Sequence, residues 1–175
     1  MTSFAARSSA LELMDAEEAG PATFRELGLI NRRLGGHAAT LDGLAGLIPP
    51  GLRRLRVLDV GCGDGEAAEA MLDWAAARGV AAEVHGIELS EASLGLAWRR
   101  QRAGLSFSRR DLFELRGAEE YDIVHAGLML HHCPGPSAGR ALAAMHARAR
   151  LGVVVNDLHR HPLAYAGIRA LTALL

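Results

Sequence analysis

The chain has 175 residues, a formal net charge of -1 and no lysine, so all of its basic side chains are arginines and histidines. One domain fits this length and two ordinary ones do not. The balanced charge provides no electrostatic surface for nucleic acid, and the missing lysine excludes a Schiff-base enzyme and a P-loop. Two cysteines are too few for a disulfide scaffold, and neither a signal peptide nor a membrane span is predicted. We therefore expect a cytoplasmic protein with no nucleic-acid or membrane partner.

The first fifty residues are predicted to be helical. Glycine or proline ends each of three helical segments, which are expected at 10–19, 23–34 and 37–48. We expect residues 1–50 to form an N-terminal helical segment that acts as a lid, and residues 51–175 to form the ligand-binding domain.

After residue 50, strands and helices are predicted to alternate. Five β-rich runs are expected, at 56–60, 83–89, 106–109, 121–126 and 153–156. Helices are expected between most of them, at 66–78, 91–102 and 137–148, with Leu94 and Trp98 in the core. This alternation predicts an α/β fold with a doubly wound, mostly parallel sheet, which binds ligands at the carboxyl ends of its strands.

A glycine-rich turn follows the first predicted strand, in the sequence Val57-Leu58-Asp59-Val60-Gly61-Cys62-Gly63-Asp64-Gly65-Glu66. Glycines allow a tight turn and let a ligand lie against bare backbone. A dinucleotide-binding loop, G-x-G-x-x-G, would have glycine or alanine at position 66, where this chain has Glu66. Asp59 puts a carboxylate beside the turn, which disfavours a pyrophosphate and favours a cation. The turn therefore favours S-adenosylmethionine, which carries an ammonium and a sulfonium, over a nicotinamide dinucleotide.

The segment VLDVGCGDG resembles the first motif of the class I S-adenosylmethionine-dependent methyltransferases. The similarity continues in chain order through VHGIELS, SRRDL and YDIVHA, and it covers roughly residues 24–172. The HH pair and NDLHRHPLAYAGIR are similar to bacterial small-molecule methyltransferases of quinone and secondary-metabolite pathways. The resemblance implies a Rossmann-like sheet, S-adenosylmethionine as cofactor, and methyl transfer to oxygen, carbon or nitrogen of a small organic acceptor.

The resemblance also implies which residues bind the cofactor. Glu88 would accept hydrogen bonds from both ribose hydroxyls, and Asp111 would accept one from the adenine amino group. The implied cofactor-binding residues are Asp59, Gly61, Cys62, Gly63, Gly65, Glu88, Leu89, Asp111, Leu112 and His125. Structural roles are the alternatives: Asp59 or Asp64 could stabilise the turn, Asp111 could cap a helix, and Cys62 could pack as a small apolar group.

His131 and His132 follow the predicted fourth strand and are the candidates for a catalytic general base. Alternatively they only shape the pocket, since an acidic acceptor needs no base. No metal site is expected, because adjacent histidines diverge and nothing completes a zinc pattern with Cys133. Asn156 and Asp157, after the fifth strand, either cap the next helix or bind the acceptor.

The fifth predicted strand is followed only by a helical run at 162–175. Related methyltransferases continue with a helix and an antiparallel strand pair, so the apolar fifth strand would be an unpaired edge here. We expect either a fragment of a longer protein or a homodimer that covers the fifth-strand edge or the C-terminal tail. The alternative function is a non-catalytic methyltransferase-like module that binds a cofactor or a partner, and a nicotinamide oxidoreductase is the third hypothesis.

Overall fold

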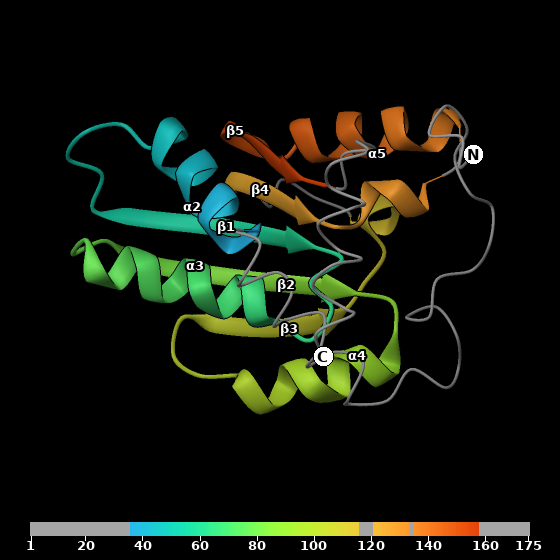
Figure 1. The fold of residues 1–175 in the computed structure, drawn as a ribbon, viewed down its shortest axis with the longest axis horizontal. Coiled ribbons are helices and arrows are strands. Elements are labelled where there is room, and N and C mark those ends of the chain that lie inside the picture. The colour runs from blue at the N-terminus through green and yellow to red at the C-terminus, as the bar shows by residue number, and fades with distance from the viewer. Residues whose placement is uncertain (1–35, 116–120, 134, 158–175) are drawn as a thin grey trace, which may run out of the picture.

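The computed structural model describes residues 36–115, 121–133 and 135–157 of the chain. At its centre is a sheet of five parallel strands in the order β3-β2-β1-β4-β5 (Figure 1). The strands are β1 (Arg54–Val60), β2 (Ala81–Glu88), β3 (Leu105–Arg109), β4 (Tyr121–Gly127) and β5 (Ala149–Asn156). The strand order reverses between β1 and β4, and a crevice for a ligand is expected at the carboxyl ends of the strands at such a point.

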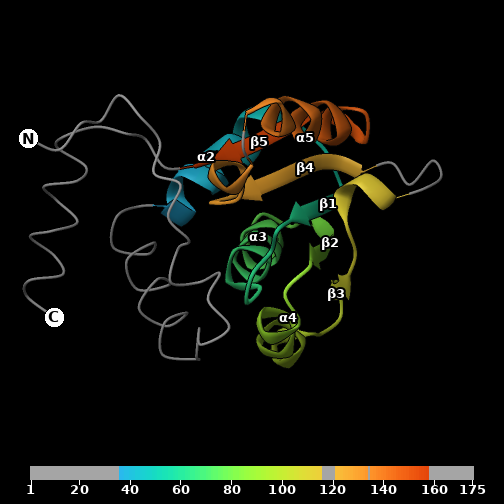
Figure 2. The ribbon, with the colours of Figure 1, turned by 90° about the vertical axis from the view of Figure 1, so that its right-hand side faces the viewer.

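Helices cover both faces of the sheet (Figure 2). One face packs against α2 (Gly36–Leu47), α3 (Glu66–Ala77) and α4 (Glu91–Ala97). The other packs against α5 (Pro136–His146) and the short 3₁₀ helix η2 (Leu112–Glu114). Two further 3₁₀ helices complete the described fold, η1 (Trp98–Arg100) and η3 (Leu130–His132). The doubly wound α/β architecture expected from the sequence is confirmed.

Alternating residues of the strands supply two separate apolar cores. Val57 of β1 joins the core under α2, α3 and α4, whereas its neighbour Leu58 joins the core under α5. Both side chains are fully buried. A central parallel strand is buried on both faces, which explains the nearly continuous apolar run in β1. Burial of each such side chain contributes about 1.5–3 kcal/mol, so the end of β1 is a rigid platform for the residues that follow.

The observed elements differ from the expected ones in detail. The fifth strand begins at Ala149 and not at residue 153, because its first residues pair with the beginning of β4. Leu94 is fully buried, as expected, but Trp98 is 48% exposed and its indole N–H donates to the carbonyl of Phe107. The expectation of a core Trp98 was wrong, because the helix changes to 3₁₀ geometry there and the four-residue spacing no longer defines one face.

The N-terminal prediction is covered only in its last part. The expected helix at 37–48 is α2, which packs against β5 and α3. The helices expected at 10–19, 23–34 and 162–175 lie outside the described residues, and the lid stays a prediction. Within the described part of the chain, every helix is too short or too polar to cross a membrane.

Candidate functional site

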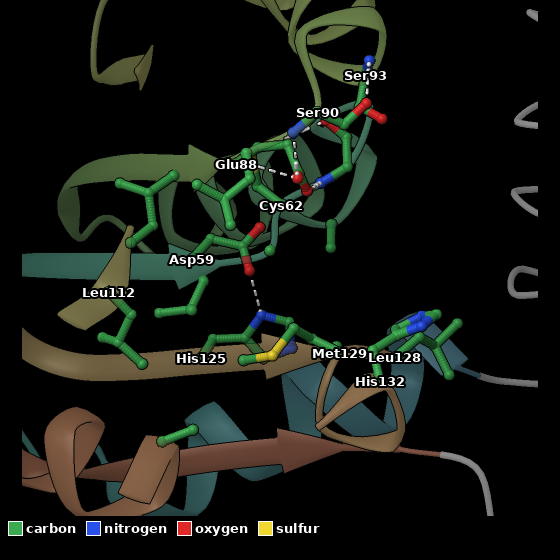
Figure 3. A pocket seen from close by; sticks show the side chains of 18 of the residues that line it. Asp59, Cys62, Glu88, Ser90, Ser93, Leu112, His125, Leu128, Met129 and His132 are labelled. Atoms are coloured by element: carbon green, nitrogen blue, oxygen red, sulfur yellow. Dashed lines mark hydrogen bonds and ion pairs between the residues drawn. The ribbon is translucent and has the colours of Figure 1, made fainter. Parts of the chain in front are cut away.

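A cavity of about 540 Å³ opens at the carboxyl ends of β1, β2 and β4 (Figure 3). Its walls come from the loop after β1, the end of β2, the segment after β3 and the turn after β4, with contributions from α2 and β5. The candidate bases His131 and His132 line it. So do all the expected cofactor-binding residues except Gly65. Segments far apart in the sequence therefore meet at one site.

The glycine loop after β1 is shaped by left-handed backbone. Gly61, Gly63 and Gly65 have φ values of +66°, +55° and +81°, a region that side-chain-bearing residues rarely adopt. A Cβ on Gly65 would lie 2.6 Å from the ring of Phe107. Gly65 thus allows the loop to pack against β3, which explains why it does not line the cavity.

Glu88 lies at the end of β2, opposite the glycine loop (Figure 3). Its Oε2 accepts a hydrogen bond from the backbone N–H of Gly63 at 3.1 Å. Its Oε1 accepts from the backbone N–H groups of Leu89 and Ser90, at 2.6 and 2.9 Å. Three backbone donors therefore hold the carboxylate at the cavity wall, and since a carboxylate offers about four acceptor positions, Oε2 can accept another bond.

Arg100, a residue that the sequence analysis did not single out, clamps the loop from outside. Its guanidinium donates to the carbonyl and the Oδ2 of Asp64, both at 2.9 Å, and to Glu69 at 2.7 Å. Asp64 Oδ1 also accepts from the backbone N–H of Glu66, so Asp64 stabilises the turn, as its structural reading predicted. No local pattern marks Arg100, because it lies 36 residues from Asp64.

Negative charge gathers around Cys62 in the loop. Burial raises the pKa of this thiol far above its ordinary value, and the carboxylates of Asp59, Glu88 and Asp64 raise it further. Cys62 is buried in the apolar core, as the packing alternative predicted, and its thiol is free. The surroundings of the loop therefore favour a cationic ligand over an anionic one.

Asp59 and His125 lie opposite one another on β1 and β4 and are both fully buried. The distance from Asp59 Oδ1 to His125 Nδ1 is 2.6 Å (Figure 3). On its other side, His125 Nε2 lies 3.1 Å from Thr40 Oγ1 of α2. Asn156, at the end of β5, donates to Thr40 Oγ1 and to the carbonyl of Gly36. Asn156 thus ties β5 to α2, a role outside the two that the sequence analysis considered.

The turn after β4 presents the candidate bases. His131 Nδ1 lies 2.6 Å from Asp157 Oδ1, and the backbone N–H of His131 donates to Asp157 Oδ2 at 3.0 Å. Asp157 therefore orients the His131 ring, whereas His132 is exposed and packs its ring against that of His131 at 4.1 Å between centroids. Leu128, at the start of this turn, has a φ of +52° and lines the cavity. Strained backbone of this kind occurs at functional sites.

The segment after β3 closes the far side of the cavity. Asp111 Oδ1 accepts from the backbone N–H of Phe113 at 2.9 Å, which is the capping role considered as an alternative. Leu112 is buried, whereas Leu89 and Phe113 are each 56% exposed and line the cavity. Phe113 escaped the sequence analysis, although an aromatic side chain directly after Leu112 was a usable signal. Among residues 36–115, 121–133 and 135–157, no group of three or more histidine, cysteine or acidic side chains is arranged to hold a metal ion.

Comparison with known proteins identifies the family. Residues 57–152 match the family described as "Methyltransferase domain", which is more than half of the chain. The chain belongs to this methyltransferase family. The resemblance to class I S-adenosylmethionine-dependent methyltransferases is thereby confirmed.

Two relatives of this methyltransferase chain are bacterial. The "Ubiquinone biosynthesis O-methyltransferase" of Aromatoleum aromaticum is 37% identical over 120 residues, which is 66% of this chain and 49% of that protein. The protein of the same name from Pseudomonas savastanoi pv. phaseolicola is 38% identical over 122 residues, with the same shares covered. The chain therefore spans about half the length of the curated relatives it matches.

Solved structures share the fold. The sugar N-methyltransferase KedS8 from a Streptoalloteichus species aligns with a TM-score of 0.61 at 20% identity, over 88% of this chain and 59% of that one. DesVI of Streptomyces venezuelae has the same TM-score at 22% identity, over 81% of this chain and 58% of its own. At these identities the likeness concerns the Rossmann-like fold of the methyltransferase domain.

Proposed function

We propose that the cavity binds S-adenosylmethionine and that the protein transfers its methyl group to a small organic acceptor. The observation that carries this proposal is the convergence of Asp59, Asp64 and Glu88 on a glycine loop at the switch point of the sheet. S-Adenosylmethionine brings an ammonium and a sulfonium, which such a site stabilises, whereas the pyrophosphate of a dinucleotide would be repelled. Family membership supports the same cofactor.

The proposed binding mode assigns the two ends of the cofactor to two sides of the cavity. Glu88 binds the ribose hydroxyls through its available acceptor positions. The adenine lies between the apolar side chains of Leu89 and Phe113, with Leu112 beneath it and Asp111 near its amino group. The methionine part lies along Asp59, Gly61, Cys62 and Gly63, beside His125. Gly65 supports the loop from behind.

The acceptor is proposed to lie at the turn after β4, where His131, His132, Leu128 and Met129 line the cavity. The cofactor supplies the reactive methyl group, so the protein has to align the acceptor with it and exclude water. The relatives are named as O-methyltransferases, and a hydroxyl acceptor is therefore the first to test.

If the acceptor needs a base, we propose His131 over His132. Asp157 accepts the Nδ1–H of His131, which leaves the basic lone pair on Nε2, at the opposite edge of the ring. This is the arrangement in which an acid orients a catalytic imidazole. The side chain of His132 is exposed and packs against the ring of His131, and its proposed role is to shape the pocket.

Two measurements test the function. Calorimetry should show binding of S-adenosylhomocysteine and none of NAD, and tighter binding of NAD would contradict the cofactor. Transfer of labelled methyl to a panel of phenols, amino sugars and small carboxylic acids should identify the acceptor class. Binding without transfer to any acceptor would favour the non-catalytic module.

We also propose that the protein forms a homodimer and that it is located in the cytoplasm. β5 is an edge of the described sheet, and Val155 on it is 40% exposed, which is compatible with a homodimer through this strand. A monomer in light scattering at micromolar concentration would contradict the dimer. Cys62 and Cys133 are not joined in a disulfide, which fits the proposal of a reducing cytoplasm.

A further inference from the structure

The strongest unexplained feature of the site is the buried carboxylate of Asp59. Its side chain is 2% exposed, and only one of its oxygens, Oδ1, has a hydrogen-bond partner among the described residues, His125. The other oxygen, Oδ2, is buried without any partner among the residues that the structure describes. A buried polar atom is rarely left unpaired, because it loses its water without compensation. Asp59 lines the cavity, so a ligand is the natural source of the missing donor.

Hydrogen bonds to His125 decide whether a charged imidazole compensates this carboxylate. Their direction can be derived from Asn156, at the other end of the hydrogen-bond network. The carbonyl oxygen of Gly36 can only accept, and the Asn156 side-chain atom 2.7 Å from it must therefore be the amide nitrogen. The same nitrogen lies 3.2 Å from Thr40 Oγ1 and donates its second hydrogen there. Thr40 Oγ1 is thus an acceptor for Asn156, and its own proton points to its remaining polar partner, His125 Nε2 at 3.1 Å.

The protonation of His125 follows from this direction. When Thr40 donates its proton in this bond, Nε2 accepts it and carries no proton itself, so the ring proton lies on Nδ1 and is donated to Asp59. The imidazole is neutral in this arrangement, and the negative charge of Asp59 is not cancelled by its partner. A doubly protonated His125 would need Thr40 to accept at Nε2 and would turn the pair into a neutral ion pair.

The other charged groups at the cavity do not neutralise Asp59 either. Asp64 and Glu88 add negative charge near the loop, and Arg100 is engaged by Asp64 and Glu69. The remaining titratable groups that line the cavity are His37, on α2 like Thr40, the thiols of Cys62 and Cys133, and Glu66, Arg110, Asp111, His131 and His132. The uncompensated charge of Asp59 and its unpaired Oδ2 both favour a ligand with a cationic N–H donor.

We propose that Asn156, Thr40 and His125 are positioning residues that keep the imidazole neutral, so that the charge of Asp59 is uncompensated and its Oδ2 is presented to the α-ammonium group of the cofactor. The inference rests on the proposed function, since S-adenosylmethionine supplies the ammonium. It adds that α2 and β5, which lie outside the glycine loop, set the charge of the cofactor site. Only Asp59 of the four residues belongs to the loop motif.

The test compares ligands with and without the ammonium. The probes are S-adenosylhomocysteine, its deamino analogue and adenosine, measured by calorimetry on the full chain. The wild type should bind S-adenosylhomocysteine about 10- to 100-fold more tightly than the deamino analogue, the range for a charge-assisted hydrogen bond. Thr40→Val removes the hydroxyl that donates to His125. Asn156→Asp replaces the amide donor with a carboxylate, so that Thr40 donates to residue 156 and accepts from His125. Asn156→Asp should bring this ratio close to one. Thr40→Val should lower the ratio by a smaller factor, because it only removes the hydroxyl that fixes Nε2 as an acceptor. Both variants should leave the affinity for adenosine unchanged.

Thr40→Ser keeps the hydroxyl and should restore the wild-type ratio. Nitrogen NMR of the ligand-free protein at neutral pH gives an independent readout. His125 should show a protonated Nδ1 and an unprotonated Nε2 in the wild type, and two protonated nitrogens in Asn156→Asp. A protonated Nε2 in the wild type would overturn the proposal, whether or not any ligand binds.

The remaining outcomes separate this inference from the proposed function. Equal affinities of the wild type for the two S-adenosyl ligands would overturn the ammonium site and leave the cofactor assignment intact. Equal losses of affinity for all three ligands in Thr40→Val and Asn156→Asp would show that Thr40 and Asn156 have only a structural role. Failure of the wild type to bind S-adenosylhomocysteine and adenosine would overturn the proposed function itself.

Discussion

The two halves of the cavity are built in different ways. On the β1–β2 side, backbone N–H groups of the glycine loop and of the two residues before α4 donate to one carboxylate, Glu88. On the β4–β5 side, side chains contact side chains from remote segments, such as Thr40 with His125, 85 residues apart. The first half depends on backbone conformation, which a short run of glycines encodes. The second depends on tertiary packing, which brings α2 and β5 to the same point.

The difference explains why the two halves should respond differently to substitution. A change in the glycine loop should disturb folding and cofactor binding together, because the loop also packs on β3. A change on the β4–β5 side should alter chemistry or charge with little effect on the fold, because apolar packing holds α2, β4 and β5 in place without these polar contacts. Four predictions test this contrast.

The largest effect is expected at His131. If His131 is the base, His131→Gln should lower the rate of methyl transfer by about 10²–10⁴-fold and leave the affinity for S-adenosylhomocysteine unchanged. Asp157→Asn should lower the rate in the same direction by a smaller factor, because it only loosens the ring. Steady-state kinetics with the matched His132→Gln variant as control provides the measurement. Full activity of the double histidine variant would leave the turn with only a shaping role.

A large loss of stability is expected at Gly65. An alanine there combines left-handed strain with a clash against Phe107, and Gly65→Ala should cost about 2–5 kcal/mol of unfolding free energy. Gly95→Ala, in α4 where a Cβ meets open space, is the matched control and should stabilise by about 0.5–1 kcal/mol. Urea unfolding measures both. Equal stability of the two variants would show that the loop does not need glycine at position 65.

An intermediate effect is expected at Glu88. Glu88→Ala should weaken S-adenosylhomocysteine binding by about 1.5–3 kcal/mol, because it removes the proposed acceptor of the ribose hydroxyls. Asp111→Asn should weaken it less, since Asp111 Oδ1 mainly caps η2. Calorimetry on both variants compares them directly. An unchanged affinity in Glu88→Ala would contradict the proposal that Glu88 binds the ribose hydroxyls.

The smallest effect is a pH dependence that comes from Cys62. Burial raises the pKa of its thiol above the ordinary value of 9.0, so the folded protein keeps the proton at a pH where the unfolded chain releases it. The stabilising contribution is therefore complete below about pH 9 and declines above it, by about 1.4 kcal/mol per pH unit.

The measurement is urea unfolding of the wild type and of Cys62→Ala from about pH 7.5 to about pH 10.5. The free energy of unfolding of the wild type should fall relative to that of the variant above about pH 9, whatever their difference at neutral pH. Parallel profiles would mean that the folded state tolerates the thiolate, which would contradict the negative surroundings of the loop.

Much of the fold could be predicted from the sequence. The five strands and the helices between them were found because their apolar runs and helical periodicities are local. Their bounds were less accurate, as β5 shows: its first residues are paired and partly exposed, so no apolar run marks them. Trp98 was misplaced because a change from α to 3₁₀ geometry is not visible in a four-residue spacing.

For the site, the sequence determined the half that depends on the backbone. The glycines of the loop, Asp59 before it and Glu88 after the next strand form a pattern because a turn of fixed shape needs these residue types at fixed distances. A family resemblance could therefore be recognised from a few adjacent residues, and all the residues that it implied except Gly65 line the cavity.

Only the tertiary structure decided the other half. It paired Arg100 with Asp64, chose Asp157 as the partner of His131, and joined Asn156 and Thr40 to His125. These contacts form between side chains on separate elements, whose relative positions depend on how the whole sheet and its helices pack. A hydrogen bond between such side chains leaves no periodicity or spacing in the sequence, because neither partner constrains the residues beside it.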